Sequence, residues 1–570
     1  MAMRGDTVLL ALITGCLAYL TLVPMAILVW GSFLSAPPGV DGELTLDKYV
    51  EAFSAGSKLF PAAANTLVFA LGGSTVAFLL GAYFAWLVER TNMPFKGAIF
   101  VLMLVPHILP GVLKAYGWLL LLSPRTGVIN VALRALLQHD VTLSIYSMPA
   151  MVWVFAADSV TLPFLIMLAA FRSMDPALEE AATTSGAGTV RVLRKVTLPV
   201  LLPAFLAGWM LVFIHAMEDF EVPAVIGLPA KIHVFATEIW FATTGSPSDL
   251  NLASVYAVSY LVPSLLILWW YSRATRASER FATITGKNFR PAMNNLGRWL
   301  GPVGLVSLGV LMLQIILPFL AIIWASLIPY YQPPSVQALG QVSLTGFSWT
   351  LTRSATYESL FNTAAIGISS TTFATLLGAV IAWIVLRTSW RGRRLLDFLA
   401  FSPIAVSGTL FGLALIWFYL TVPFGDAVYG TIWIVSLGYI AKFLPQSMRF
   451  NYAALGQVHR ELEEASAMSG ADWATTFRRV VVPLIMPGLA AAWIYVIALT
   501  FKVLSLPVML SGVNNKVLSV LIFELVEQNQ TQRLAALGVL LVALLAVMTL
   551  AARVVSRRFG VQHGQLAAAR

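Results

Sequence analysis

The stretch LEEAATTSGAG at residues 178–188 returns as LEEASAMSGAD at residues 462–472, 284 positions later. The match continues past the glycines, since Pro199 and Pro203 fall opposite Pro483 and Pro487. A second match lies upstream in the same order, where residues 65–91 pair with residues 362–388 and 13 of the 27 positions are identical. Two matches in one order indicate a duplicated chain rather than a chance resemblance.

The composition is that of a membrane protein with many spans. Of the 570 residues, 59% are hydrophobic and only 11% are charged, against about a quarter charged in soluble proteins. A helix needs about 20 apolar residues to cross a bilayer. Twelve stretches qualify: residues 8–33, 62–88, 97–122, 145–171, 200–225 and 251–272, then 300–327, 362–386, 395–421, 428–449, 484–510 and 534–555.

These spans predict an all-α polytopic membrane protein with about 12 transmembrane helices in two tandem six-helix repeats. We place the first six-span domain at residues 1–273, a basic linker at 274–298 and the second domain at 299–570. Because six is even, both repeats have one orientation, and the axis that relates them should run along the membrane normal. The first half has about 13 extra residues, most simply within 123–140.

Basic residues gather in alternate loops, which sets the expected orientation. Loops rich in Arg and Lys remain on the cytoplasmic side of a membrane. This rule places both termini, the linker and both copies of the repeated phrase in the cytoplasm, with acidic loops outside. The net charge of +10 therefore reflects topology, and it argues against binding of nucleic acid. The basic loops hold Arg90, Lys96, Arg191, Arg194, Lys195, Arg387, Arg391, Arg393, Arg394, Arg478 and Arg479.

The repeated phrase predicts two short helices joined at a glycine. Residues 178–185 have helical phasing, and Gly186 and Gly188 should end the helix. Residues 189–197 then form a second, basic helix, and Pro199 starts the next span. An amphipathic loop helix with good caps is the simpler interpretation of one copy. Two copies at the same point before a fifth span instead favour a docking surface for another protein.

In this form the two phrases resemble the "EAA" coupling loops in the integral membrane subunits of bacterial ABC importers. The first copy carries the pattern in Glu179, Glu180, Ala181, Ala182, Gly186, Leu198, Pro199 and Pro203. The second carries it in Glu463, Glu464, Ala465, Gly470, Pro483 and Pro487. It departs at two places, where Ser466 stands for the second Ala and Val482 for the Leu before Pro.

The resemblance implies a type I ABC importer permease in the bacterial inner membrane. In this family the loops dock into a cleft of a separate ATP-hydrolysing subunit, so two copies of that subunit are expected to bind ATP and Mg²⁺. A periplasmic solute-binding protein would deliver the substrate, and membrane lipid surrounds the spans. Fused chains of this length resemble iron(III) importer permeases most. Related branches take polyamines, thiamine, sulfate or 2-aminoethylphosphonate.

Charged residues inside the predicted spans are candidates for the translocation path, because such residues are costly in a bilayer and often functional. The candidates are Asp158, Lys442, Glu218, Asp219 and Lys502. The repeat register sets Lys442 opposite Asp158 and Lys502 opposite Glu218. Matched positions would face each other across the axis, as a gate pair or as the lining of a polar cavity. The alternative is separate snorkelling to the outer interface.

Motifs for chemistry are missing from the sequence. It has no G-x-x-x-x-G-K-[ST] phosphate loop, no Cys/His group with metal-ligand spacing and no legible Ser/His/Asp arrangement. We therefore expect a transport subunit without its own ATPase site, metal or cofactor. A secondary transporter that couples to an ion gradient through Asp158 or Glu218 is the rival class. A membrane-embedded enzyme is a weaker alternative.

Overall fold

A computed structural model describes residues 3–278, 294–388, 390 and 392–558. Within these residues almost every element is a helix, and the only β structure is two isolated bridges, Leu34 with Leu44 and Thr91 with Asn294. The predicted all-α class is therefore confirmed. Most of the predicted linker, residues 279–293, lies outside the described residues.

The first half has its helices where the sequence places the first six spans. They are α1, η1 and α2 (Met3–Leu17, Ala18–Leu22, Val23–Gly31), α4 (Leu59–Arg90), α5 with α6 (Lys96–Ile108, Gly111–Leu122), α8 with α9 (Met148–Ser159, Thr161–Ser173), η2 with α12 (Leu193–Thr197, Leu198–Met217) and α14 (Leu250–Ser278).

The second half repeats this order. Its elements are η5, α15, η6 and α16 (Gly297–Trp299, Leu300–Leu311, Met312–Ile316, Leu317–Leu327), α19 (Ser354–Arg387), α20, η7 and α21 (Arg393–Phe401, Ser402–Ala405, Gly408–Thr421), α22 (Ile432–Leu455), η9 with α25 (Phe477–Val481, Val482–Lys502) and α28 (Thr531–Arg558).

Short helices connect the spans at both ends of the molecule. On one side lie α10 and α11 (Pro176–Thr184, Thr189–Val192) and α23 and α24 (Glu461–Met468, Trp473–Thr476). The other connecting elements are α3 (Asp47–Phe53), α7 (Val128–Leu137), η3 (Pro223–Gly227), α13 (Phe235–Thr244), α17 (Val336–Leu339), α18 (Thr345–Thr352), η8 (Gly425–Ala427), α26 (Pro507–Leu510) and α27 (Leu518–Glu527).

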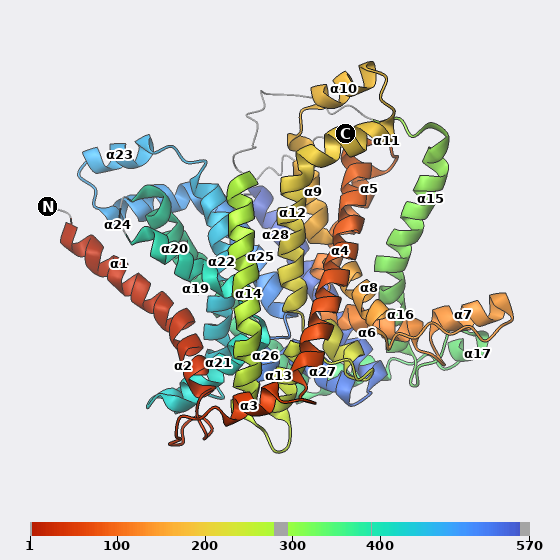
Figure 1. The fold of residues 1–570 in the computed structure, drawn as a ribbon, viewed down its shortest axis with the longest axis horizontal. Helices are drawn as coiled ribbons and strands as arrows, with labels where there is room; N and C mark the ends of the chain where they lie inside the picture. The colour runs from red at the N-terminus through yellow and green to blue at the C-terminus, as the bar shows by residue number, and fades with distance from the viewer. Residues whose placement is uncertain (1–2, 279–293, 389, 391, 559–570) are drawn as a thin grey trace.

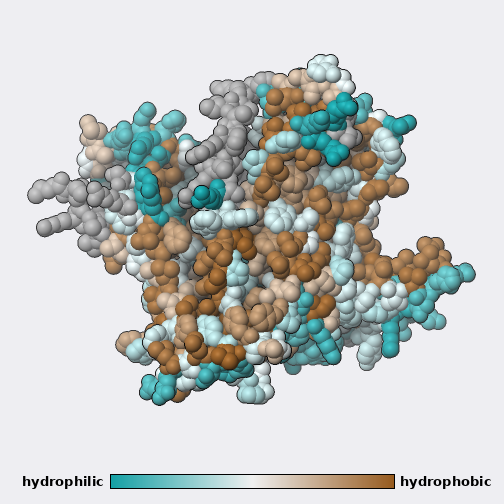
Figure 2. Space-filling view, in the orientation of Figure 1, coloured by the Kyte–Doolittle hydropathy of each residue, from teal (hydrophilic) through white to brown (hydrophobic). Residues whose placement is uncertain are grey.

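Each of the twelve predicted spans is occupied by a helix or by a series of helices. By length and composition, eight helices of the described chain could cross a membrane, and three bent pairs raise the number to 11. The remaining stretch is α22, which has 24 residues but includes Lys442, Gln446 and Arg449. Figure 2 shows the expected banding, with apolar side chains across the middle and polar ones gathered at the two ends.

Three predicted spans are broken, which the sequence analysis did not anticipate. The chain bends by 104° between α5 and α6, by 54° between α8 and α9, and by 110° between the stretch 393–404 and α21. Pro110 immediately precedes α6, and Pro403 lies within η7. Proline lacks an amide donor and clashes with the preceding helical turn, so it favours a break at these points.

Two further spans end earlier than predicted. α12 ends at Met217 instead of continuing to residue 225, and α25 ends at Lys502 instead of residue 510. The chain then runs through short irregular segments before η3 and α26. Glu218, Asp219 and Lys502 therefore lie at or beyond a helix end, where backbone groups are free to accept or donate hydrogen bonds.

The first span of each half packs against the other half. α2 packs on α21, and α16 packs on α6. The hydrophobic cores show the same crossing of the first spans between the halves. Leu10, Ile13 and Leu17 belong to a core whose other residues all come from the second half. Leu311 and Ile315 likewise belong to a core built otherwise from the first half. A third, larger core contains residues of both halves, so the two repeats are joined through it.

Figure 1 shows α10, α11, α23 and α24 at one end of the molecule, where α1 also begins, while α3, α13 and α27 lie at the opposite end. Both copies of the repeated phrase are thus on one side of the helical layer. That this side is cytoplasmic remains a prediction from the distribution of basic residues.

Candidate functional site: two elbows and a charged seam

The two copies of the repeated phrase fold into the same shape. We call residues 176–197 the first elbow and residues 461–481 the second. Gly186 and Gly470 both have φ of +81°, a left-handed conformation that residues with a Cβ rarely adopt. The next amide closes the turn in each case: Ala187 donates to the carbonyl of Ala182, and Ala471 donates to that of Ser466. The predicted break at Gly186 is confirmed.

The second arm of each elbow differs from the prediction. Pro199 does not start a separate span, because α11 continues through the π-helical turn η2 directly into α12. The second elbow does the same from α24 through η9 into α25. A π turn adds one residue to the helical path. In both halves it comes just before a proline in the first turn of the next helix, and we attribute its position to that proline.

A buried arginine at the end of α4 holds the first elbow. Arg90 is fully buried. Its Nη1 donates to Glu179 Oε2 at 3.2 Å, and its Nη2 donates to the carbonyls of Phe171 at 2.8 Å and Met174 at 3.2 Å. Thr197 Oγ1 donates to the other oxygen of Glu179 at 2.6 Å. A buried ion pair needs such additional hydrogen bonds to offset its desolvation.

The second elbow is held by the matching arginine at the end of α19. Arg387 Nε lies 3.0 Å from Glu463 Oε1. Its Nη2 donates to the carbonyls of Leu455 at 3.0 Å and Val458 at 2.5 Å, which are the repeat equivalents of Phe171 and Met174. We call each set of arginine, glutamate and two carbonyls a clamp. Trp383 Nε1 donates to Glu463 Oε2 at 2.9 Å and completes the second clamp.

The paired glutamates of each phrase therefore face in opposite directions. Glu179 is buried and Glu463 is largely covered, whereas the next residues, Glu180 and Glu464, are exposed. Ala181 and Ala465 are exposed beside them. One carboxylate of each pair fixes the elbow to the membrane helices. The other lies on a surface with small side chains that a partner can approach closely.

The predicted path residues lie together near the broken spans, but not in the predicted pairs. Lys442 contacts Glu218 Oε2 at 2.5 Å and donates to the carbonyl of Val406 at 2.7 Å. The expected pairing of Lys442 with Asp158 is therefore wrong, and so is that of Lys502 with Glu218. The reason is the break after η7, because Val406 lies in the irregular segment where the lysine can reach its free carbonyl.

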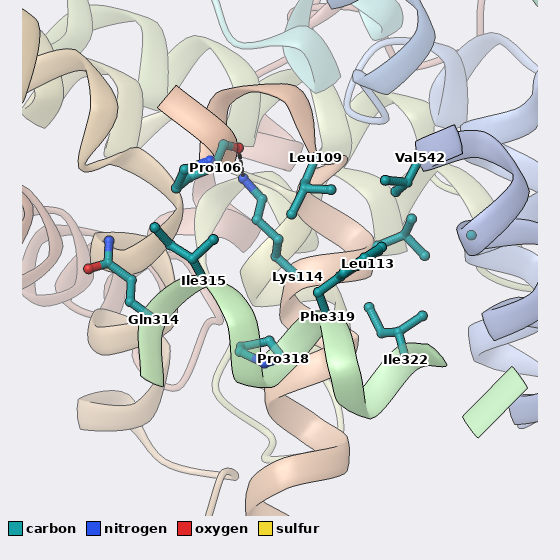
Figure 3. A pocket seen from close by; sticks show the side chains of 11 residues that line it. Pro106, Leu109, Leu113, Lys114, Gln314, Ile315, Pro318, Phe319, Ile322 and Val542 are labelled. Carbon is teal, nitrogen blue, oxygen red and sulfur yellow. Dashed lines mark hydrogen bonds between the residues drawn. The ribbon is translucent and has the colours of Figure 1, made fainter. Parts of the chain in front are cut away.

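Asp158 is paired within its own half. Its carboxylate forms an ion pair with Lys114 of α6. Lys114 also donates to the carbonyl of Pro106 at 2.5 Å, and Figure 3 shows this contact at the edge of a small pocket lined also by Gln314 and Pro318. Pro106 lies in the last turn of α5, so the lysine caps a helix C-terminus, where cations are favoured. Asp219 accepts from the amide of Val222 at 3.2 Å.

Three contacts in this region join the two halves, and we call them the seam. The first is the Glu218–Lys442 pair. In the second, Lys502 Nζ donates to the carbonyl of His107 at 2.9 Å. In the third, the amide of Leu504 donates to Glu221 Oε1 at 3.1 Å.

The helix starts beside the seam require glycine. A Cβ added to Gly111, the first residue of α6, would lie 1.8 Å from Glu221 Oε2. At the matching Gly408, the first residue of α21, a Cβ would lie 2.2 Å from Ser505 Oγ. Ser505 is the repeat equivalent of Glu221, so both halves place a polar side chain against the start of a broken-span helix. A carboxylate is favoured at a helix N-terminus.

Sequence reasoning missed three residues of these sites. Arg90 and Arg387 were taken only as markers of topology, although they occupy one position of the upstream repeat. Lys114 was not singled out. Within the described residues, no group of three or more His, Cys, Asp or Glu side chains is placed to hold a metal ion.

Comparison with known proteins identifies the family. A family profile described as "Binding-protein-dependent transport system inner membrane component" matches residues 73–279 and again 374–561. The chain belongs to this family, and each half carries one match. This confirms the resemblance drawn from the repeated phrases and places the chain among the permease components of ABC importers.

Two relatives that are permease proteins agree with this assignment. The ferric transport system permease protein FbpB of Actinobacillus pleuropneumoniae is 28% identical over 394 residues, which is 68% of this chain. The match spans about half the length of that relative, 55%. A probable ABC transporter permease protein of Sinorhizobium fredii is 26% identical over 537 residues, 91% of this chain and 90% of that protein. A solved bacterial ABC transporter that imports alginate has 21% identity and a TM-score of 0.38, and the match covers 45% of this chain and 88% of that one.

Proposed function

We propose that this chain supplies a pair of membrane domains of a bacterial ABC importer, and that two copies of a separate ATP-binding-cassette subunit bind to its two elbows. The observation that carries the proposal is the matched geometry of the elbows. Both lie on one side of the molecule, and each has one glutamate held in a clamp and one exposed beside an alanine. Two equivalent docking surfaces on one chain are what an ATPase that acts as a dimer would require.

The clamps make each elbow part of a larger rigid unit. Arg90 ties α10 to the end of α4 and to the carbonyls that end α9. Arg387 ties α23 in the same way to α19 and to the end of α22. When the ATPase subunits close, a force applied at an elbow would therefore move two spans of that half together. Rigid-body rocking of packed helices is a common form of transport motion.

We further propose that the seam is the gate of the translocation path. Its three contacts join the halves where spans are broken, so rocking of the halves would separate them. We expect the Glu218–Lys442 ion pair to hold this gate closed, since both side chains are mostly covered and each is the other's counter-charge. An ion pair of this kind is stable only while both partners stay in place. Asp158, paired with Lys114, would then shape the wall of the path.

Iron(III) is the proposed cargo, supported by the similarity to a ferric permease over 68% of this chain. The described residues include no group of side chains placed to hold a metal ion. We therefore propose that a periplasmic solute-binding protein selects the substrate and that this chain conducts it. A small organic solute such as 2-aminoethylphosphonate or a polyamine is the alternative cargo for the same machinery.

Uptake of radiolabelled iron(III) by cells that lack this chain, complemented with variants, tests the proposal. Glu180→Lys combined with Glu464→Lys should lower uptake at least about tenfold, because two charge reversals oppose docking, while the chain still inserts in the membrane. Glu358→Lys is the control, an exposed glutamate at the other end of α19. Uptake of a polyamine instead of iron would change the cargo but keep the importer. Unchanged uptake in the double variant would favour an ion-driven transporter.

A further inference from the structure

A long apolar groove runs along the second half between α19, α25 and α28. Its volume is about 610 Å³. Thr375 and Leu376 line it from α19, Met486 and Trp493 from α25, and Leu545 and Met548 from α28. It arises because α28 packs mainly along α16 and α18, whereas its counterpart α14 packs closely along α12.

The repeat register shows which side chains leave this space open. In the first half Phe78 and Phe205 pack edge to face at 4.3 Å, and Phe213 stacks on Trp209 at 5.3 Å. The equivalents of the three phenylalanines are Thr375, Leu489 and Ile497, and all three line the groove. The second half thus keeps the matching tryptophan, Trp493, but has smaller side chains where the first half has rings.

The groove is longer than the hydrocarbon layer of one lipid leaflet. Its lining on α25 runs from Val482 to Ala498, which at 1.5 Å per residue is about 24 Å. One leaflet contributes about 15 Å of hydrocarbon, half of the 30 Å core. The groove therefore reaches from the elbow side to beyond the middle of the apolar layer, and its lining is almost wholly apolar.

Two arginines lie at the elbow-side end of the groove. Arg478 and Arg479 are exposed, and neither has an ion pair among those found in the described residues. They lie in the π turn η9, four and three residues before Val482, so both are within one helical turn of the first residue of α25 that lines the groove. Basic side chains at the membrane surface attract anionic headgroups.

From this combination we infer that the groove binds one anionic phospholipid of the leaflet on the elbow side. An acyl chain would lie along Leu489, Trp493 and Ile497, and the phosphate would face Arg478 and Arg479. The lipid would then fill the space between α25 and α28 next to the second elbow. The first half, with its three phenyl rings, would lack such a site.

Native mass spectrometry of the full chain in mild detergent tests this inference. Phosphatidylglycerol and phosphatidylcholine with the same acyl chains are supplied together. We expect one phosphatidylglycerol retained per chain, preferred roughly tenfold or more over phosphatidylcholine because two basic residues favour it. Thr375→Phe with Leu489→Phe and Ile497→Phe, which gives the second half the first half's side chains, should abolish retention. Arg478→Gln with Arg479→Gln should remove the preference without disturbing packing.

Arg194→Gln with Lys195→Gln is the matched control, since these residues occupy the same positions in the first half and should not affect retention. The inference is overturned if the wild-type chain retains no phosphatidylglycerol above phosphatidylcholine, or if the control lowers retention as much as the test pair. Retention of a second copy of the chain or of another protein in place of lipid would also overturn it. The filled variant is interpreted only if its thermal unfolding matches the wild type. If it does not match, the result of the Arg478→Gln with Arg479→Gln variant, whose changes lie on the surface, decides the test.

Discussion

The two elbows perform one task with partly different parts. Both have an arginine from the preceding long span, a glutamate, two carbonyls, a left-handed glycine and a π turn before a proline. They differ in the second partner of the glutamate. In the first elbow it is Thr197, on the elbow itself, and in the second it is Trp383, on α19.

This difference follows from single substitutions between the repeats. The equivalent of Thr197 is Val481, which has no hydroxyl group to donate. The second elbow instead has Trp473 and Phe477, which pack with Trp383 in an aromatic group. The features that both elbows retained after duplication are those that a rigid lever requires. The second partner could change because several side chains can donate to one carboxylate.

The largest expected effect is loss of a clamp. Arg90→Met leaves Glu179 buried without its counter-charge, which should lower the free energy of unfolding by about 3–5 kcal/mol. Arg387→Met should have a smaller effect, because Glu463 and Arg387 are less completely buried. Thermal unfolding in detergent measures both. Adding Glu179→Leu to Arg90→Met should recover most of the loss, and a single variant as stable as the wild type would contradict the clamp.

The second partners should have intermediate effects and sharpen the comparison directly. Thr197→Val removes a hydrogen bond to a carboxylate, worth about 1.5–3 kcal/mol, and Trp383→Phe removes the equivalent bond while it keeps most of the aromatic packing. Val481→Thr gives the second elbow the hydroxyl group of the first and should make Trp383→Phe less harmful. If Val481→Thr brings no recovery, the two partners are not interchangeable.

Replacing the glycines of the elbows should have a similar or smaller effect on stability. It should have a clear effect on the coupling between ATP hydrolysis and the binding protein. Gly186→Val and Gly470→Val place a Cβ at φ of +81°, a strain of about 1–2 kcal/mol that should change the angle of the elbow. ATP hydrolysis by the reconstituted complex should then become independent of the binding protein. Gly188→Ala is the control, since it has open space and ordinary φ. Normal regulation in both valine variants would count against the elbow geometry.

The smallest effect is expected for the contacts of α3 and α18, the short helices that precede α4 and α19. Lys48 of α3 contacts Asp249 at 2.6 Å and Glu51 at 2.9 Å, whereas the equivalent Thr345 of α18 makes a neutral bond to Gln532. The hydrogen bond to Asp249 raises the pKa of Lys48. The pair should therefore stabilise the chain fully below the usual lysine pKa of about 10.4 and lose this effect as pH rises through the higher folded value.

The Asp249→Asn variant tests the contribution of the Lys48–Asp249 ion pair. It should lower stability by less than about 1 kcal/mol near pH 8, as for other partly exposed pairs, and the difference should disappear at a pH above the raised pKa of Lys48. Thermal unfolding at the two pH values measures it. An equal loss at both would show that Asp249 acts through packing and not through the charge of Lys48.

Local patterns in the sequence were sufficient for the spans, the duplication and the elbows. The length of an apolar stretch predicts a membrane span, and Gly186 and Gly470 predict a turn. Both predictions depend only on residues that are neighbours in the sequence. The repeat also fixed which positions correspond. The exposed Glu180 and the buried Glu179 could not be told apart, since both lie in the first half of α10 and only contacts with Arg90 and Thr197 distinguish them.

Long-range contacts explain what the sequence analysis missed. The pairing of Lys442 with Glu218 depends on where the chain breaks after η7, and the pairing of Asp158 with Lys114 depends on the bend before α6. Apolar composition continues through both breaks, so hydropathy does not reveal them. The exchange of α2 and α16 between the halves likewise depends on packing of distant segments, which no periodicity records.

Site-directed cross-linking tests the central claim most directly. In a chain whose single cysteine is removed by Cys16→Ser, Ala181→Cys and Ala465→Cys place one thiol on each elbow, and Val513→Cys places one on an exposed residue of another loop. With the ATP-binding-cassette subunit present, both elbow thiols should cross-link to it and Val513→Cys should not. Cross-linking of either elbow to the periplasmic binding protein, or failure of both to reach the ATPase subunit in a complex that still transports, would contradict the account.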